Sequence, residues 1–316
     1  MHLFCDYKIG EIPHSEYPRP QFRRDDYHCL NGVWRFAVRK AGAPLCNYDK
    51  TIVVPFSPET LNSGVDGMKR VTASDRLYYG RDFVAERSWL DCDTLLHFGA
   101  VDYYCDVYVN GKYAGSHEGG YTAFTVDITS FIEEGDNSLD VVVWDSTEES
   151  QGGRGKQKTE RGGIWYTAQS GIWQTVWIEN VPKKRIEDFT ITTDAEKKEA
   201  YVDVVCEGET EYFVYDGKKL ILSGKSNGRI SLGYDFELWT PEKPKLYDLV
   251  LVYGDDKVYS YFGVRSFGIA TDVNGIKRFT LNGKPYFFSG LLDQGYWPDG
   301  LRTPPCDSAV VQELKC

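Results

Sequence analysis

Apolar and polar residues alternate with a two-residue period at several places in this chain, most clearly within residues 95–128. The segment 105–109 reads CDVYV, which is typical of a strand with one buried face. Asn110-Gly111 follows at once, and this pair favours a tight type I′ turn because both residues tolerate a positive φ. The pattern therefore predicts a β-hairpin, with a further strand over 124–128.

The same period predicts strands on both sides of this hairpin, which together would form one β-sandwich ending near Pro182. These predicted strands are 33–39, 52–55, 76–84, 139–144 and 172–178. In the last of them, Gln174 falls on the same face as the aliphatic side chains. Residues 1–28 are polar and contain several prolines, so we expect an extended arm laid over a domain.

Two long segments interrupt the strand pattern. Residues 56–72 contain proline, serine, asparagine and glycine, and residues 146–167 include the charged, glycine-rich run GGRGKQKTERGG. Loops of this length are usually functional or covered by another part of the protein. The second segment has two interpretations, a mobile surface loop or a rim over a binding site, and the sequence leaves both open.

Residues 183–270 carry short strand patterns and turn signals at regular spacing. The strand-like runs are FTIT, YVDVVC, YFVYDGKKLIL, RISLGYDF, YDLVLVYG and VYSYFGV. This rhythm predicts a small immunoglobulin-like β-sandwich. The Cys–Trp–Cys pattern of antibody domains does not occur, so we do not expect an antibody-type domain.

The pattern changes again after residue 271. Residues 278–290 read as a hairpin with Asn282-Gly283 at its tip. The run YFFSGLL over 286–292 is nearly all apolar and predicts a strand that is buried on both faces. The sequence TPPCD from 303 to 307 then reads as the start of a helix, as in one half of a βαβ unit.

Composition supports a β-rich protein and narrows its partners. Aromatic residues make up 15% of the chain, and there are 31 glycines and 13 prolines, as expected for sandwiches with tight turns. The net charge of −11 argues against nucleic acid or an anionic membrane as a partner. The apolar runs are too short for a transmembrane span, and we find no signal peptide at the N-terminus.

The cysteines and histidines suggest no metal site. The eight cysteines are scattered without zinc-type spacing, and the five histidines show no metal-ligand spacing either. Cys105 and Cys206 lie in apolar strand patterns, so we expect buried free thiols and a reducing, cytoplasmic location. We expect no metal and no other cofactor.

Six stretches, taken in order, form a set: LNGVWRF, VDYYCDVYVNGKYAGSHEGGYTAFTVDIT, GIWYTAQSGIWQTVWIENVP, LWTPEKPKLYDLVLVYG, FGVRSFGI and FTLNGKPYFFSGLLDQGYWPDGLRTP. This ordered set resembles glycoside hydrolase family 2, which contains β-galactosidases, β-glucuronidases and β-mannosidases. The resemblance implies an all-β chain with a sugar-binding jelly roll over 1–182 and an immunoglobulin-like sandwich over 183–270. Residues 271–316 would hold the first strand and helix start of a truncated (β/α)₈ barrel.

The resemblance also implies what the chain lacks. Family 2 enzymes hydrolyse glycosides with retention, using two carboxylates about 5 Å apart on a barrel of about 200–250 residues. Only about 45 residues follow the second predicted domain, and neither catalytic glutamate has a counterpart. We therefore expect a truncated, inactive N-terminal portion.

Five residues are candidates for sugar contact by this resemblance: Asn62, Asp145, Asp293, Gln294 and Trp297. Asp145 ends a predicted strand, where an ordinary turn carboxylate is the alternative. The last three follow the first barrel strand and would face the catalytic side, where Trp297 could stack on a sugar or pack beneath the barrel.

The charged, glycine-rich loop carries four basic residues, Arg154, Lys156, Lys158 and Arg161. They could contact an acidic sugar, or they could be a solvated surface.

We expect the non-catalytic region of a β-galactosidase-like exo-β-glycosidase, whose partner is a β-linked sugar. The alternatives are a stand-alone, lectin-like carbohydrate-binding protein and a purely structural protein. Homo-oligomerisation is left open.

Overall fold

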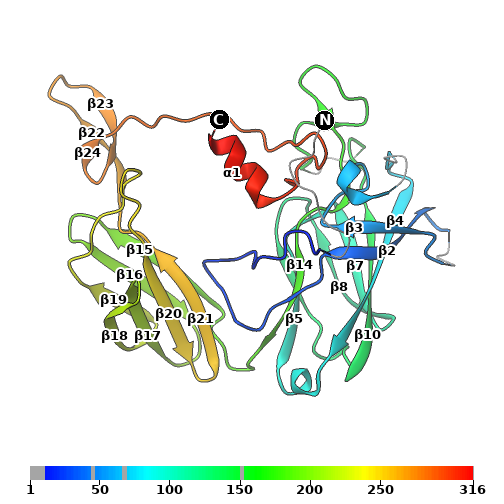
Figure 1. Ribbon diagram of the computed structural model, residues 1–316, viewed down its shortest axis with the longest axis horizontal. Helices are drawn as coiled ribbons and strands as arrows, with labels where there is room; N and C mark the ends of the chain where they lie inside the picture. The colour runs from blue at the N-terminus through cyan, green and yellow to red at the C-terminus, as the bar shows by residue number, and fades with distance from the viewer. Residues whose placement is uncertain (1–10, 44–46, 66–69, 150–152, 316) are drawn as a thin grey trace. The chain divides into compact units, whose positions relative to one another are not determined.

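The computed structural model describes residues 11–43, 47–65, 70–149 and 153–315 of the chain. The chain divides into two compact units (Figure 1). Unit 1 comprises Met1–Pro18, Asp26–Asn180 and Gln294–Cys316, and unit 2 comprises Arg19–Asp25 and Val181–Asp293. Both are built from β-strands, and α1 (Asp307–Lys315) is the single α-helix of the described ranges. The prediction of an all-β protein of sandwich domains is confirmed.

Unit 1 is organised by two sheets, with strand orders β3-β2-β4-β10-β7-β8 and β1-β14-β5-β9. The first sheet, antiparallel throughout, contains β2 (Gly32–Lys40), β3 (Lys50–Val54), β4 (Asp75–Ala85), β7 (Tyr104–Val109), β8 (Lys112–Glu118) and β10 (Gly135–Trp144). The second contains β1 (His28–Cys29), β5 (Asp93–Phe98), β9 (Phe124–Asp127) and β14 (Val176–Val181). Two short pairs join β6 (Val101–Asp102) to β13 (Gly171–Ile172) and β11 (Gln157–Lys158) to β12 (Tyr166–Thr167).

The hairpin predicted from the alternating pattern is formed by β7 and β8. Asn110 and Gly111 have φ values of 51° and 72°, as a type I′ turn requires, so this prediction is confirmed. The Asn110 side chain also donates to the carbonyl oxygen of Phe131 at 3.0 Å and accepts from the amide of Ser138 at 2.9 Å. The turn is therefore tied to β10 as well as to its own strands.

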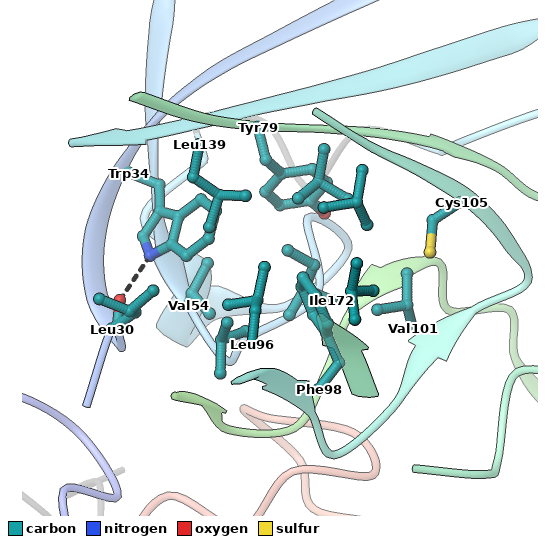
Figure 2. Packing of buried hydrophobic residues seen from close by; sticks show 14 of the residues in the cluster. Leu30, Trp34, Val54, Tyr79, Leu96, Phe98, Val101, Cys105, Leu139 and Ile172 are labelled. Carbon is teal, nitrogen blue, oxygen red and sulfur yellow. Dashed lines mark hydrogen bonds between the residues drawn. The ribbon is translucent and has the colours of Figure 1, made fainter. Parts of the chain in front are cut away.

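The core of unit 1 is filled by the alternate side chains of its strands (Figure 2). Trp34 from β2 and Leu139 from β10 are fully buried there, as are Leu96 and Phe98 from β5. The indole of Trp34 donates to the carbonyl oxygen of Leu30 at 2.7 Å, so the one polar atom of this side chain is satisfied inside the core.

The segment 172–178 differs from its prediction as one half-buried strand. It is divided between β13 and β14, and nearly all of it is buried on both faces. Gln174, predicted on the apolar face, is exposed between the two strands. The side chain approaches Gly99 so closely that a Cβ there would lie 2.7 Å from that of Gln174. The alternation was misleading because the two short strands pair in different sheets.

Unit 2 is a second sandwich of two antiparallel sheets around its own apolar core (Figure 1). One sheet contains β15 (Asp188–Asp194), β16 (Glu199–Val205) and β19 (Arg229–Gly233). The other has the order β18-β17-β20-β21 and contains β17 (Glu209–Asp216), β18 (Lys219–Asn227), β20 (Tyr247–Tyr253) and β21 (Asp256–Phe262). These are the strands predicted by the regular turn spacing.

Residues 19–25, part of the predicted N-terminal arm, are grouped with unit 2. Arg23 pairs with Tyr259 as an antiparallel bridge along β21. The neighbouring Arg24 forms a buried ion pair with Asp256, with both carboxylate oxygens within 2.9 Å of the guanidinium nitrogens. A buried charge pair of this kind fixes the arm to the sandwich.

The third predicted segment, 271–316, is shared between the units. Its hairpin is confirmed in β22 (Phe267–Thr271), β23 (Lys277–Leu281) and β24 (Lys284–Pro285), with Asn282 and Gly283 at positive φ. Residues 286–292 form no strand, and Phe287 and Leu291 are 87% and 100% exposed, so the predicted buried strand is wrong for this structure. An apolar run is buried only where partners cover it. Phe288 packs against the rings of Phe267 and Phe279, but Phe287, Leu291 and Leu292 stay exposed.

The helix predicted after the prolines is confirmed as α1, which belongs to unit 1 with the rest of 294–316. The predicted domain limits at residues 182 and 270 differ from the limits of the two compact units. The predicted limits stay a prediction. In the described part of the chain, no helix is long and apolar enough to cross a membrane.

Candidate functional site

The carboxyl side chain of Asp145, at the end of β10, lies inside unit 1. The residue is 5% exposed, and its Oδ1 accepts a hydrogen bond from the amide of Thr147 at 2.6 Å. Its Oδ2 accepts from the hydroxyl of Ser170 at 2.9 Å, and the amide of Ser170 donates to Glu59 at 3.2 Å. Ser170 therefore links two buried carboxyl groups from different loops.

A third buried carboxyl group, Asp102 at the end of β6, joins this cluster through Gln157. The Gln157 side-chain amide donates to Asp102 at 3.3 Å and to the hydroxyl of Tyr121 at 2.7 Å. Its oxygen accepts from the amide of Gln169 at 2.7 Å. Gly120 leaves space for the carboxyl group, because a Cβ there would lie 2.2 Å from Asp102 Oδ1. We name Glu59, Asp102 and Asp145 the carboxyl cluster.

Burial dominates the electrostatics of the carboxyl cluster. It raises the pKa of Glu59 to about 8 against the hydrogen bonds from Ser170, and Asp145 adds a smaller increase. Burial also raises the pKa of Asp102 to about 8, with repulsion from Asp145 as the next cause. The pKa of Asp145 is raised by burial too. Protonated carboxyl groups at neutral pH can share one small volume without mutual repulsion.

The cluster has no room for a sugar. The space beside Asp102, Asp145 and Gln157, closed by Thr147 and Arg154, has a volume of about 10 Å³. A space of that size holds about one water molecule. These carboxyl groups therefore hold the charged, glycine-rich loop in place, and they cannot flank a glycosidic bond in this arrangement.

A larger cavity of about 510 Å³ lies next to the cluster, with Glu59 as one wall, and we name it the rim cavity. Its other lining residues include Leu61, Arg70, Arg161 and Asp299. Arg161 donates to the Thr167 hydroxyl at 3.2 Å. Cavities of about 300–1,000 Å³ are typical for small ligands, so a monosaccharide fits here.

Asn62 lies close to the rim cavity and is joined to it by one backbone contact. Its amide donates to the carbonyl oxygen of Asp299 at 3.2 Å. The Asn62 side-chain nitrogen and Asp299 Oδ1 are buried, and neither has a hydrogen-bond partner among the described residues. Buried polar atoms are normally satisfied, so these two are available to water or to a ligand.

The other predicted residues are placed differently. Trp297 is half-buried and exchanges two backbone hydrogen bonds with Leu301, which makes a tight turn. Gln294 is exposed at the start of the same segment, and Asp293 is exposed in unit 2. The structure thus brings Asn62 and Asp145 to neighbouring places in unit 1. Sugar contact by any of the five stays a prediction.

Sequence reasoning missed Arg302, which anchors the segment 294–303. Its guanidinium lies over the rings of Tyr121 at 4.6 Å and Tyr296 at 5.0 Å, and its amide donates to Gln169 at 3.2 Å. Tyr296 in turn stacks on Tyr166 at 3.9 Å between ring centroids. Cation–π contacts of this kind depend on tertiary structure, so no local pattern marks them.

Within the ranges that the structure describes, no group of three or more histidine, cysteine, aspartate or glutamate side chains could hold a metal ion.

Comparison with known proteins agrees with this picture. Residues 27–182 match the family model described as "Glycosyl hydrolases family 2, sugar binding domain". A putative β-glucuronidase from Formosa agariphila is 38% identical over 98 residues, which are 31% of this chain and 11% of that protein. A β-glucuronidase from Paenibacillus borealis is 27% identical over 294 residues, covering 83% of this chain and 48% of that protein.

Among solved structures, a β-glucuronidase from Ruminococcus gnavus in complex with D-glucuronic acid has a TM-score of 0.73 and 19% identity. The match covers 92% of this chain and 54% of that one, and it shows the shared fold. The chain spans about half the length or less of the curated relatives it matches.

Proposed function

We propose, from the premise that this chain belongs to glycosyl hydrolase family 2, that it is the non-catalytic sugar-binding and immunoglobulin-like region of a retaining exo-β-glycosidase. The observation that carries the proposal is the family match over 27–182, which contains the carboxyl cluster and two of the loops that line the rim cavity. The carboxyl cluster is sealed, so the proposal does not place hydrolysis there.

We further propose that the sugar is a β-glucuronide. The matched relatives named as β-glucuronidases support this choice. The rim cavity adds a physical reason in Arg161, because Arg161 lines it whereas the other lining arginine, Arg70, is already paired with Glu160 at 3.0 Å. Guanidinium groups bind carboxylates through charge-assisted hydrogen bonds, and the rim cavity is large enough for a uronic acid.

The proposal is tested by titrating the chain with D-glucuronic acid and, separately, with D-galactose. Saturation-transfer NMR measures the binding of each sugar. We expect weak binding of glucuronic acid, weaker binding of galactose, and a loss of about fivefold to tenfold for glucuronic acid in Arg161→Ala. Lys156→Ala is the matched control, since this residue is exposed on the same loop and does not line the rim cavity. Equal affinity for both sugars would contradict the β-glucuronide assignment.

The same protein should not turn over nitrophenyl β-glucuronide, β-galactoside or β-mannoside. If the parent chain hydrolysed one of these substrates and Asp145→Asn did so at the same rate, a carboxyl pair elsewhere in the chain would be catalytic. That result would overturn the non-catalytic assignment.

We also propose that unit 2 self-associates through its exposed apolar segment. Phe287, Leu291 and Leu292 are each more than four-fifths exposed. Soluble monomers rarely expose several large apolar side chains in one short segment. Light scattering of concentrated protein should show oligomers, and Phe287→Ser combined with Leu291→Ser should return the chain to a monomer. Val205→Ser changes a single exposed residue on β16 and serves as the control. A monomeric parent chain at every concentration would refute this.

A further inference from the structure

The outer face of the β18-β17-β20-β21 sheet in unit 2 carries a row of three side chains with no role in the sandwich core. Strand register places Tyr215 of β17 opposite Asp248 of β20, and Asp248 opposite Tyr261 of β21. Their sequence neighbours Val214 and Leu249 are fully buried on the inner face. The row Tyr215–Asp248–Tyr261 therefore points away from the core.

The polar atoms of this row are unused by the protein. In the described part of the chain, no hydrogen bond or ion pair involves the hydroxyl groups of Tyr215 and Tyr261 or the carboxylate of Asp248. Asp248 is exposed and the two tyrosines are half-buried. Two aromatic rings with a carboxylate between them are thus presented to whatever occupies this face.

A neighbouring tyrosine shows the contrasting arrangement. The Tyr259 hydroxyl donates to Asp25 at 2.8 Å. The Arg23 guanidinium lies 4.4 Å from the centre of its ring and the Lys257 ammonium 4.7 Å. Since residues 19–25 pair with β21 through Arg23, this cluster makes a fixed wall along one side of the row.

The wall and the sheet enclose a groove with a volume of about 790 Å³. That volume is in the range of about 300–1,000 Å³ that is typical of ligand sites. Neighbouring strands are about 4.8 Å apart, so the two tyrosines, on strands separated by β20, are about 10 Å apart. The charged lining residues are Arg23, Lys257, Glu211 and Asp248. Their positive and negative charges cancel, so the groove does not favour a highly charged ligand.

We propose that this groove binds a neutral β-linked oligosaccharide. Alternate pyranose rings stack their C–H faces on Tyr215 and Tyr261, and Asp248 between them accepts hydrogen bonds from the hydroxyl groups of the intervening sugar. A rigid aromatic platform with one carboxylate suits a ligand that has both apolar faces and many donors. The site would hold a glycan independently of the reaction of the parent enzyme.

Cellotetraose, xylotetraose and mannotetraose are the probes, with tetragalacturonic acid as the charged comparison. Titration of the 316-residue chain, read by saturation-transfer NMR and calorimetry, should show binding of at least one neutral tetrasaccharide and weaker binding of the acidic one. Tyr215→Ala and Tyr261→Ala should each weaken binding about tenfold, and Asp248→Asn should weaken it about threefold to tenfold.

Tyr201→Ala is the matched control, since it removes a half-buried tyrosine from β16 in the other sheet of unit 2. It should leave tetrasaccharide binding unchanged, and every variant should keep the unfolding midpoint of its parent within a few degrees. The proposal is overturned if no neutral tetrasaccharide binds at millimolar concentration, or if Tyr215→Ala and Tyr261→Ala bind as the parent does. The titration with D-glucuronic acid should be the same in all these variants, which separates this site from the rim cavity.

Discussion

Replacing Arg24 by alanine is expected to lower the free energy of unfolding of unit 2 by about 3–5 kcal/mol. The side chain of Arg24 is 6% exposed and that of Asp256 is 1% exposed. The substitution therefore leaves a buried carboxylate without its counter-charge. The guanidinium also donates to the carbonyl oxygen of Ile186 at 2.8 Å, and Asp256 accepts from the amide of the same residue. Hydrogen exchange followed by mass spectrometry resolves the two units and should show the loss in unit 2.

Two further variants separate charge from geometry at this pair. Arg24→Lys keeps the charge and loses the planar fork, so we expect an intermediate loss. Arg24→Leu combined with Asp256→Leu removes both charges and should cost less than Arg24→Ala alone. Arg229→Ala is the control, because its pair with Asp203 is solvent-exposed and worth at most about 1 kcal/mol. If Arg24→Ala were as mild as Arg229→Ala, the arm would not depend on this ion pair.

Elements that depend on neighbours in sequence could be predicted, and the two Asn-Gly hairpins are the clearest cases. A positive φ at Asn110 and at Asn282 is a local preference that survives in any context. The alternating runs of β2, β4 and β10 were also reliable, because each strand has one face in the core.

Elements that depend on distant partners could not be predicted. Arg24 in the arm pairs with Asp256, which is more than two hundred positions away in the sequence. Nothing in the local sequence of Arg24 indicates a buried charge. The run 286–292 shows the opposite case, since its apolar residues predict burial but most of them are exposed. The period of apolar residues predicts which face of a segment can be buried, but it does not predict which other segment covers that face.

The candidate site shows the same limit. Asp145 was found because it ends an obvious strand, but its burial and its link to Glu59 through Ser170 are tertiary facts. Glu59 and Asp102 were missed because a carboxyl group at a loop or strand end is usually exposed. The signal that could have found them is their setting, since each lies beside apolar or small residues in FSPET and FGAVD.

The carboxyl cluster makes the stability of unit 1 depend on pH in a defined direction. Glu59 and Asp102 both have a pKa raised to about 8 in the folded chain, from 4.5 and 3.8 for the free groups. Between about pH 5 and pH 8 the unfolded chain has released these protons while the folded chain keeps them. Unfolding then releases protons, so the free energy of unfolding falls as pH rises through this window, and above it the loss is complete.

Each group contributes a slope of up to about 1.4 kcal/mol per pH unit. Two such groups set an upper limit of about 8 kcal/mol over these three pH units. We expect urea unfolding of unit 1, monitored by hydrogen exchange, to show a net decrease of several kcal/mol, below that limit, between pH 5 and pH 8. Glutamine has the shape of a protonated glutamate and does not ionise. Glu59→Gln should therefore change stability by less than about 1 kcal/mol at pH 5 and raise it by about 1–3 kcal/mol at pH 8.

Glu86→Gln is the control for this comparison, because Glu86 is exposed before a 3₁₀-helix and its side chain makes no capping hydrogen bond. Its stability curve should follow that of the parent chain at every pH. A parent chain whose stability is flat or rises from pH 5 to pH 8, with no gain for Glu59→Gln, would mean that the cluster is ionised in the folded state. In that case Arg302 would be the counter-charge of Asp102, and Glu59 would add a negative charge to the rim cavity that disfavours a uronic acid.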